Sequence, residues 1–359
     1  MRQAVRHGVP APKRAILVGM LVVGPTFVTA CGGQHPAPKA VAQAGPAAPV
    51  AVVHVAAQGN AGARAIAAAA AAAGAGRRIV VYRQADPARA RELGRLTVAG
   101  LRDGRPQAGH TVPMTCSRVA FAAGHGVCLD VLDTNTTVAL LDSRLRQVAV
   151  LVLAGIPSRV RISPDGRLAG VTTAELGHTY TGPGPVSTHT TIIDLDRKTV
   201  VADLTRDVQV NIGGRVLRAA DRSFWGLTFA SDGDTYYATA GSGGRTWLIQ
   251  GSIRAGRAHA IHANVESPAL SPDETRIAYE HAVAQNPTRW RLHVLDLATG
   301  RDWGLAERRS IDDQPAWLDD RHVLYADALG VTWVADADGG GRPRRWLDHG
   351  TSATVSRAG

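Results

Sequence analysis

A short turn sequence that recurs along the chain limits what this protein can fold into. In the stretch Arg161–Val171 it reads Ser, Pro, Asp, Gly, with apolar residues on both sides. Proline presets the first corner of a type I turn, aspartate accepts hydrogen bonds from nearby amides, and glycine takes the left-handed conformation that follows. The flanking Ile162, Leu168 and Val171 favour strands. The stretch therefore predicts a β-hairpin.

The hairpin sequence has further copies, two clear and two degenerate. They are Phe229–Tyr237 and Leu270–Tyr279, then Ala316–Tyr325 and Val119–Val127. A second pattern, a strand followed by a turn that is Thr-Gly in its clearest copy, also repeats. Its copies are Leu96–Arg105, Val138–Gln147, Thr190–Thr199, Trp247–Arg257, Leu292–Arg301 and Thr332–Arg342. Together the two patterns describe one unit of about four short strands.

The spacing of the second pattern identifies the architecture. With Asp296 as the marker, the other equivalent positions are Gly100, Asp142, Asp194, Gly251 and Asp336, at intervals of 40 to 57 residues. Four-stranded units of about 40–45 residues are typical of propeller blades. We expect an all-β fold, a six-bladed β-propeller over residues 77–359. The two long intervals predict insertions, at Gly177–His189 and Asp207–Asp221, which we expect to be protruding loops.

The two ends of the repeat region predict how the ring closes. The first unit has strands near Ile79–Arg83 and Leu96–Gly100 but no hairpin sequence before them. The chain end, Thr351–Ser356, resembles the start of a repeat. We therefore expect this C-terminal strand to be the inner strand of blade one, where it would cover an open sheet edge.

The N-terminal sequence is interpreted as a targeting signal. Residues 1–14 are basic and residues 15–28 form an apolar run that is short for a membrane-spanning helix. The sequence from Val28 to Cys31 resembles a bacterial lipobox, in which the cysteine receives a lipid. We expect residues 1–30 to be a lipoprotein signal peptide, and Cys31 to anchor an exported protein to the outer face of the cytoplasmic membrane. The alternative is an ordinary secretory signal with an incidental cysteine.

Residues 31–76 are predicted to be a tether. They consist largely of Ala, Pro and Gly, a composition typical of extended, flexible linkers. The run Ala67–Ala73 has high helix propensity. It lacks an amphipathic pattern and is followed by Gly74 and Gly76, so we expect a frayed helix at most. The predicted organisation is signal peptide 1–30, tether 31–76 and propeller 77–359.

The net charge argues against nucleic acid as a partner. The formal charge of +10 falls to +6 once the predicted signal peptide is removed. The arginines are scattered, and no basic face or nucleic-acid-binding module is recognised. We expect a monomer that binds no nucleic acid.

The hairpins, followed by a strand, Asp-Leu and Thr-Gly, resemble the PD40/WD40-like propeller repeats of TolB-type proteins. The whole chain resembles the TolB-like lipoproteins of high-GC Gram-positive bacteria. The resemblance covers about residues 77–359 and the lipobox, and it implies the propeller fold. TolB carries an α/β domain before its propeller, and residues 32–76 cannot form one. The resemblance therefore does not extend to a Tol–Pal role.

The remaining cysteines, Cys116 and Cys128, lie in a domain that we expect to be exported, where disulfides persist. In a simple hairpin turning at Gly124, Cys116 would face a position near 133. A bridge thus requires the segment before Val119 to fold back. We expect a disulfide, with two separate buried thiols as the alternative.

No motif for catalysis or metal binding is found. The sequence has no Gly-x-Ser-x-Gly elbow, zincin helix or phosphate loop, and its 13 histidines have no zinc spacing. His178 and His189 flank one insertion and are interpreted as solvated. The turn aspartates Asp165, Asp232 and Asp273 are explained by their backbone hydrogen bonds. We therefore expect no catalytic residues, no metal and no cofactor.

The segment Glu307–Gln314 is the candidate partner-binding loop. It connects blades five and six and carries Arg308, Arg309, Asp312 and Asp313. We expect a polar recognition loop at the rim of the central channel. The alternative is that these arginines pair with these aspartates within the loop.

Trp225 lies just before the hairpin of blade four, near the rim of the channel or in the core. We add it to the candidate partner-binding residues.

The sequence favours a lipid-anchored, non-catalytic binding or scaffold protein of the cell envelope. Its partner would be an envelope protein or a peptidoglycan-associated protein. The alternatives are a propeller enzyme acting on envelope glycan or peptide, whose catalytic groups come from distant blades, and a sensor of a small ligand.

The lipidation hypothesis predicts the behaviour of one variant. Cys31→Ala should release the protein from membranes or stall its processing, because the cysteine is the only attachment point for the lipid. Fractionation and mass spectrometry of the mature N-terminus provide the measurement. The double variant Cys116→Ala/Cys128→Ala should remain anchored. An unmodified N-terminal residue in the mature wild-type protein would contradict the hypothesis.

Overall fold

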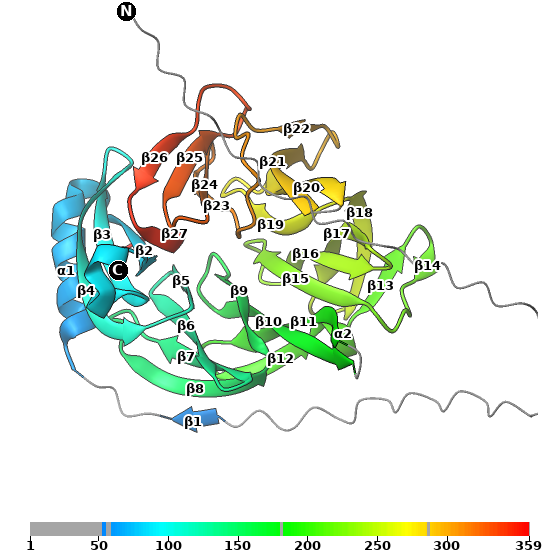
Figure 1. The fold of residues 1–359 in the computed structure, drawn as a ribbon. Coiled ribbons are helices and arrows are strands. Elements are labelled where there is room, and N and C mark those ends of the chain that lie inside the picture. Colours follow the sequence, from blue (N-terminus) through cyan, green and yellow to red (C-terminus); the bar gives the residue numbers. More distant parts are fainter. Residues whose placement is uncertain (1–51, 55–58, 180–181, 286–287, 359) are drawn as a thin grey trace, which may run out of the picture. The chain divides into compact units, whose positions relative to one another are not determined.

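The computed structural model describes residues 52–54, 59–179, 182–285 and 288–358. In this part of the chain, strands form six sheets arranged around a ring (Figure 1). The predicted six-bladed β-propeller is therefore confirmed. Residues 1–51, which include Cys31, lie outside the described residues.

The first three blades follow one another along the chain, apart from the inner strand of blade one and the outermost strand of blade two. Blade one contains β27 (Gly350–Arg357), β2 (Arg78–Gln84), β3 (Arg95–Arg102) and β4 (Arg105–Thr115). Blade two contains β5 (Arg118–Ala122), β6 (His125–Leu132), β7 (Asn135–Leu141) and β8 (Gln147–Ala154), with β1 (Val52–His54) at its outer edge. Blade three contains β9 (Ile156–Ile162), β10 (Leu168–Thr179), β11 (Gly182–Asp194) and β12 (Thr199–Asp203).

The last three blades repeat the arrangement. Blade four contains β15 (Ser223–Phe229), β16 (Thr235–Ser242), β17 (Arg245–Ser252) and β18 (Arg257–Ala263), with β13 (Gln209–Ile212) and β14 (Arg215–Val216) added outside. Blade five contains β19 (Glu266–Leu270), β20 (Arg276–Gln285), β21 (Thr288–Asp296) and β22 (Asp302–Gly304). Blade six contains β23 (Ala316–Asp319), β24 (His322–Ala326), β25 (Thr332–Asp336) and β26 (Arg344–Leu347).

Every predicted hairpin joins the first two strands of a blade, and the turn chemistry is as expected. In blade three, Gly166 has a φ of +81°. Asp165 accepts a hydrogen bond from the Arg167 amide at 3.1 Å, and its carboxylate is held by the Ser163 hydroxyl at 2.5 Å. The aspartate is thus occupied by its own turn, as the sequence indicated.

The C-terminal strand closes the ring as predicted. Strand β27 pairs antiparallel with β2, so that Val355 lies opposite Val80 and Ser356 opposite Ile79 (Figure 1). The Thr354 hydroxyl lies 3.2 Å from the Phe121 amide of blade two. The last strand of the chain therefore completes the first blade and also contacts the next one.

Apolar contacts between neighbouring blades form the core. Within the described residues, the buried apolar side chains fall into six clusters, one at each junction between blades. Residues such as Val80, Leu129 and Ile193 have no exposed surface. Each blade thus buries both of its faces, which explains the nearly continuous apolar runs of its middle strands.

The predicted frayed helix is a regular one, α1 (Ala61–Ala73), which packs on blade one (Figure 1). Ala69 has no exposed surface. A Cβ at Gly100 of β3 would lie 2.3 Å from the Ala69 carbonyl oxygen, so only glycine allows this approach. Alanines lack the large apolar side chains that reveal an amphipathic helix, which explains why the sequence did not predict this packing.

Three shorter elements complete the described helical structure: η1 (Gly74–Gly76), η2 (Pro87–Glu92) and α2 (Leu204–Asp207). No helix in the described ranges is long and apolar enough to cross a membrane.

A disulfide joins Cys116 to Cys128, with a Cα–Cα distance of 5.4 Å. Cys128 faces Val119 across the first hairpin of blade two. Cys116 precedes that hairpin, where its amide bonds the carbonyl oxygen of Gly94 in blade one. The chain therefore folds back before Val119, and the bridge fastens the crossover from blade one to blade two.

The two insertions are not the protruding loops that we expected. Residues 177–189 extend the β10–β11 hairpin, with pairing that continues to Thr179 and Gly182. Residues 207–221 include β13, which pairs in parallel with the outer strand β18. The first insertion pairs its two halves with each other, and the second adds a strand to an existing sheet. Both arrangements satisfy backbone groups that a free loop would leave to water.

The closure of the ring predicts the effect of a truncation. A stop codon after Gly350 should give an insoluble or protease-sensitive protein, because blade one would lose its inner strand and the ring its clasp. A stop after Ala358, which keeps β27, is the matched control. Solubility, proteolysis and thermal midpoint provide the measurement. If the shorter chain were soluble and melted within about a degree or two of full length, closure by β27 would be wrong.

Candidate functional site

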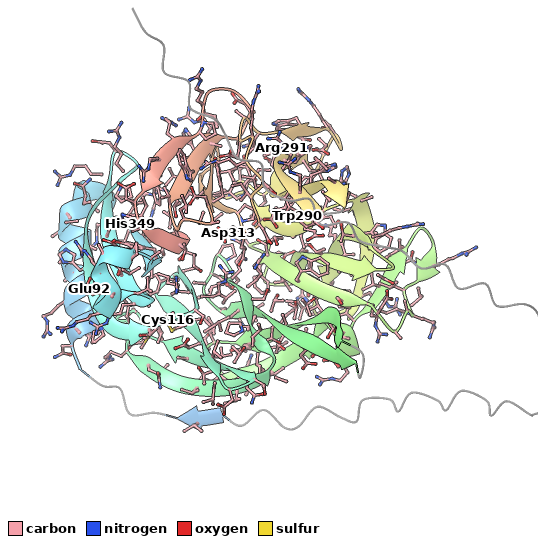
Figure 2. The ribbon with its side chains drawn as sticks, viewed as in Figure 1. Glu92, Cys116, Trp290, Arg291, Asp313 and His349 are labelled. Atoms are coloured by element: carbon pink, nitrogen blue, oxygen red, sulfur yellow. A yellow bond between two sulfur atoms is a disulfide. The ribbon has the colours of Figure 1, made fainter. Side chains whose placement is uncertain are left out.

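The connector between blades five and six, residues 305–315, crosses the mouth of the central channel. Its start and end adjoin β22 and β23, yet it bonds blades two and three on the opposite side of the ring. Asp312 Oδ1 lies 3.2 Å from a guanidinium nitrogen of Arg159, and Asp313 Oδ1 lies 3.5 Å from one of Arg118. Figure 2 shows Asp313 near the centre of the ring. The segment therefore plugs the channel rather than standing at its rim.

Asp313 ties the connector to three blades. Only 8% of its surface is exposed. Its Oδ2 accepts a hydrogen bond from the Ala326 amide at 2.9 Å, and its own amide donates to Glu280 Oε1 at 2.5 Å. Together with Arg118, these partners come from blades two, five and six.

Further bonds attach the end of the connector to blade three. The Val160 amide donates to Gln314 Oε1 at 3.2 Å, and Arg161 donates to the Pro315 carbonyl at 2.8 Å. Burial lowers the pKa of Arg161 to about 10, against the opposing charge of Asp313. A guanidinium at that pKa remains charged at neutral pH, so the network is ionic.

The alternative interpretation of this described segment, in which Arg308 or Arg309 pairs with Asp312 or Asp313, is not observed. Arg309 instead bonds Glu307 at 2.5 Å and Asp327 at 3.0 Å, and it lies 4.0 Å from the centre of the Trp333 ring. Burial opposes ionisation of Glu307, but bonds from Arg309 and Tyr325 outweigh it and lower its pKa to about 2. Arg309 thus fastens the start of the connector to blade six.

Arg308 and Asp312 form the exposed part of the connector. Arg308 is exposed and has no hydrogen-bond or ion-pair partner among the described residues. The Asp312 side chain is 75% exposed even though it touches Arg159. A positive and a negative side chain therefore face solvent at the channel mouth.

A cleft of about 690 Å³ lies beside the connector on the same face. Its apolar walls are Trp225, Trp247 and Trp290, each partly buried. A Cβ at Gly241 would lie 2.7 Å from the Trp225 ring, so glycine allows the indole to lie against the strand. Arg159 lines the cleft and also holds Asp312, which makes the cleft and the connector one continuous surface, the mouth face.

Two carboxyl groups with raised pKa values lie at this surface. Glu266 lines the cleft, and burial together with the charge of Asp312 raises its pKa to about 7, partly offset by Arg159. Glu280 lies opposite Glu266 in the sheet and is 1% exposed. Burial raises its pKa well above the usual range, and Arg159 opposes that shift.

Sequence reasoning found the connector and Trp225 but missed the groups that hold the connector. Arg159 and Arg161 alternate along the inner strand of blade three, a position that faces the channel in a propeller. That alternation was a usable signal. Arg118 and Glu266 are single charged residues at the start of inner strands, and no motif marks them.

The fold and this plugged mouth place the chain in the class of six-bladed β-propellers. No protein-family model matches the chain, and a comparison with curated proteins finds no match. Solved structures do match. TolB from Acinetobacter baumannii has 18% identity and a TM-score of 0.56, covering 77% of this chain and 66% of the TolB chain. This chain therefore spans just under two thirds of that TolB.

Two further solved structures belong to the comparison. A chain of the Nidogen/Laminin complex has 11% identity and a TM-score of 0.55, over 78% of this chain and 99% of the other. A putative TolB from Agrobacterium tumefaciens has 13% identity and a TM-score of 0.45, over 79% and 98%. At these identities the shared feature is the fold.

Glu266 predicts a pH dependence of stability. Its carboxyl binds a proton more tightly in the folded chain, so its contribution to stability is complete below pH 4.5 and is lost as pH rises through about 7. Glu266→Gln should therefore gain a few degrees of thermal midpoint over wild type between pH 5 and pH 8. Glu175→Gln, at a side chain 44% exposed, is the control. Parallel pH profiles for wild type and Glu266→Gln would contradict this assignment.

Proposed function

We propose that the chain is an exported lipoprotein, anchored through Cys31, whose propeller binds a protein partner of the cell envelope without catalysis. The observation that carries the proposal is the connector fixed across the channel mouth. It presents Arg308 and Asp312 to solvent beside three tryptophans. Arginine and aromatic side chains on a rigid surface are the residues that dominate binding energy in protein interfaces.

The carboxylates at the mouth favour binding over catalysis. Asp312 and Asp313 pair with arginines from other blades. Glu280 is buried and bonds the backbone of the connector. These groups hold the plug in place, and a catalytic acid or base must instead reach the substrate.

One observation supports a second candidate function. Glu266 lines a cleft large enough for a small molecule, and its raised pKa suits proton transfer near neutral pH. An enzyme acting on envelope glycan or peptide, or a sensor of a small ligand, would use this cleft. The other carboxyl in the described lining of the cleft, Asp221, already accepts hydrogen bonds from the Ser242 hydroxyl and the Gly243 amide, which makes this the weaker candidate.

The structural neighbours support protein binding in general. One of them was solved in a Nidogen/Laminin complex, and another is TolB. Envelope location and lipid anchoring rest on the N-terminal sequence.

The partner-binding proposal is tested by site-specific photocrosslinking in membranes. A crosslinking residue at Arg308 should capture one partner reproducibly. The same residue at Arg167, in the turn at the opposite end of β9, should capture it at least several-fold less. The variant Arg308→Ala/Asp312→Ala should reduce capture from a crosslinker placed at Ser310 to a similar extent. Equal capture from both ends would contradict the assignment of the mouth face, and turnover of an envelope glycan or peptide that Glu266→Gln abolishes would favour the enzyme.

A further inference from the structure

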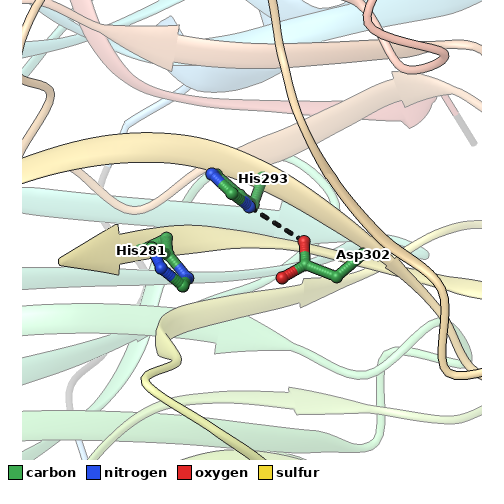
Figure 3. Close-up of side chains that lie close together, drawn as sticks. All are labelled: His281, His293 and Asp302. Atoms are coloured by element: carbon green, nitrogen blue, oxygen red, sulfur yellow. Dashed lines mark hydrogen bonds and ion pairs between the residues drawn. The ribbon is translucent and has the colours of Figure 1, made fainter. Parts of the chain in front are cut away.

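We propose that His281, His293 and Asp302 of blade five form a binding site for a divalent transition-metal ion of the zinc class. One ligand atom from each residue lies within 4.8 Å of the others. The close-up in Figure 3 shows the three side chains close together. Two imidazoles and one carboxylate are ligands that favour zinc, copper, nickel or ferrous iron over magnesium and calcium.

Sheet pairing brings the three residues together. They lie on three adjacent strands, β20, β21 and β22. His293 lies opposite Tyr279 on one side and Gly304 on the other, and paired residues point to the same face of a sheet. Tyr279 belongs to the apolar cluster shared with blade four. The three ligands therefore lie on the face of blade five that meets blade four.

Blade four supplies a fourth candidate ligand. His262 of β18 has its Nε2 3.6 Å from Asp302 Oδ2. The side chains of His262, His293 and Asp302 are 27%, 19% and 22% exposed, which leaves an entry path for an ion. A metal held by all four residues would join two blades.

Neighbouring side chains orient the carboxylate. Asp302 accepts hydrogen bonds from the Tyr279 hydroxyl at 2.7 Å and from His293 Nδ1 at 2.8 Å. Hydrogen bonds of this kind fix the position of a ligating carboxylate.

Hydrogen bonds alone do not satisfy both ring nitrogens of His281. Its Nε2 lies 3.0 Å from the Asn264 amide nitrogen, which also bonds the Ala282 carbonyl. Its Nδ1 is buried and has no hydrogen-bond partner in the described part of the chain. Buried polar atoms of native proteins normally have a partner.

The two imidazole rings must move to share one ion. They are stacked with centroids 4.4 Å apart and planes 13° apart, so their in-plane lone pairs do not converge. Gly304 faces His293, and a Cβ there would be in tight contact with the ring, 3.3 Å from Nε2, so glycine leaves this side of the imidazole free. The ion then replaces the His293–Asp302 hydrogen bond with two coordination bonds.

The cluster lies at the junction between blades four and five, so an ion bound there would affect the stability of the ring. Among the described residues, the junction between blades four and five has the smallest of the six apolar clusters, with six buried residues. A coordinated ion there would add a connection where apolar packing is least, and would raise the stability of the ring by mass action.

The test uses the full-length chain without a polyhistidine tag, freed of metal by chelation and titrated with Zn²⁺ in a calorimeter. Wild type should bind one equivalent at this site, and its thermal midpoint should rise. His293→Ala and Asp302→Ala should weaken this binding at least tenfold, and Mg²⁺ should not compete.

The control is His322→Ala. His322 also bonds an aspartate at 2.8 Å, Asp319 of blade six, but within the described residues it belongs to no three-ligand group. Its loss should leave zinc affinity unchanged. His293→Gln, which keeps the size of the side chain, replaces the alanine variant if that one does not fold. No saturable zinc binding by wild type, or equal affinity in wild type and both blade-five variants, would overturn the proposal.

Discussion

The structure depends on mutual burial of neighbouring sheets. Each blade presents apolar side chains on both faces, and only the two adjacent blades can cover them. Residues such as Leu151 and Ile192 would be exposed in an isolated blade, yet here they have no exposed surface. A partial ring would leave two such faces in water, which makes the complete ring the unit of stability.

The channel mouth is built differently, from ion pairs. Arg118 and Arg161 are partly buried, and this burial lowers the pKa of each. A buried ion pair gains little net free energy, because desolvation offsets the attraction between the charges. Removing one partner is costly, so the network specifies one position for the connector. A rigid connector keeps Arg308 and Asp312 in a fixed arrangement, which reduces the entropy cost of binding a partner.

The sequence could predict those features that are encoded in consecutive residues, and not those that depend on contacts between distant residues. The Ser-Pro-Asp-Gly turns and the last strand were predictable, because turn chemistry and repeat order are written in consecutive residues. The docking of α1 was not, since alanine packing depends on the shape of the surface at Gly100. The groups around the connector could not be assigned either: Gln314 bonds the backbone of a residue 154 positions earlier.

The cluster on blade five illustrates the same limit. His281, His293 and Asp302 are separated by 12 and 9 residues, which matches no metal-binding motif. They meet because β20, β21 and β22 pair in one particular register. A sheet register is fixed by the whole hydrophobic pattern of the strands, which a search for short motifs does not read.

The pairing of β27 with β2 also determines when the ring can close during synthesis. During synthesis β2, β3 and β4 of blade one emerge early, but β27, which completes their sheet, is made after all the other strands of the ring. Until β27 is made, the nascent chain holds an open edge at β2. The ring can therefore close only once β27 has been synthesised, and the propeller becomes a single cooperative unit at that point.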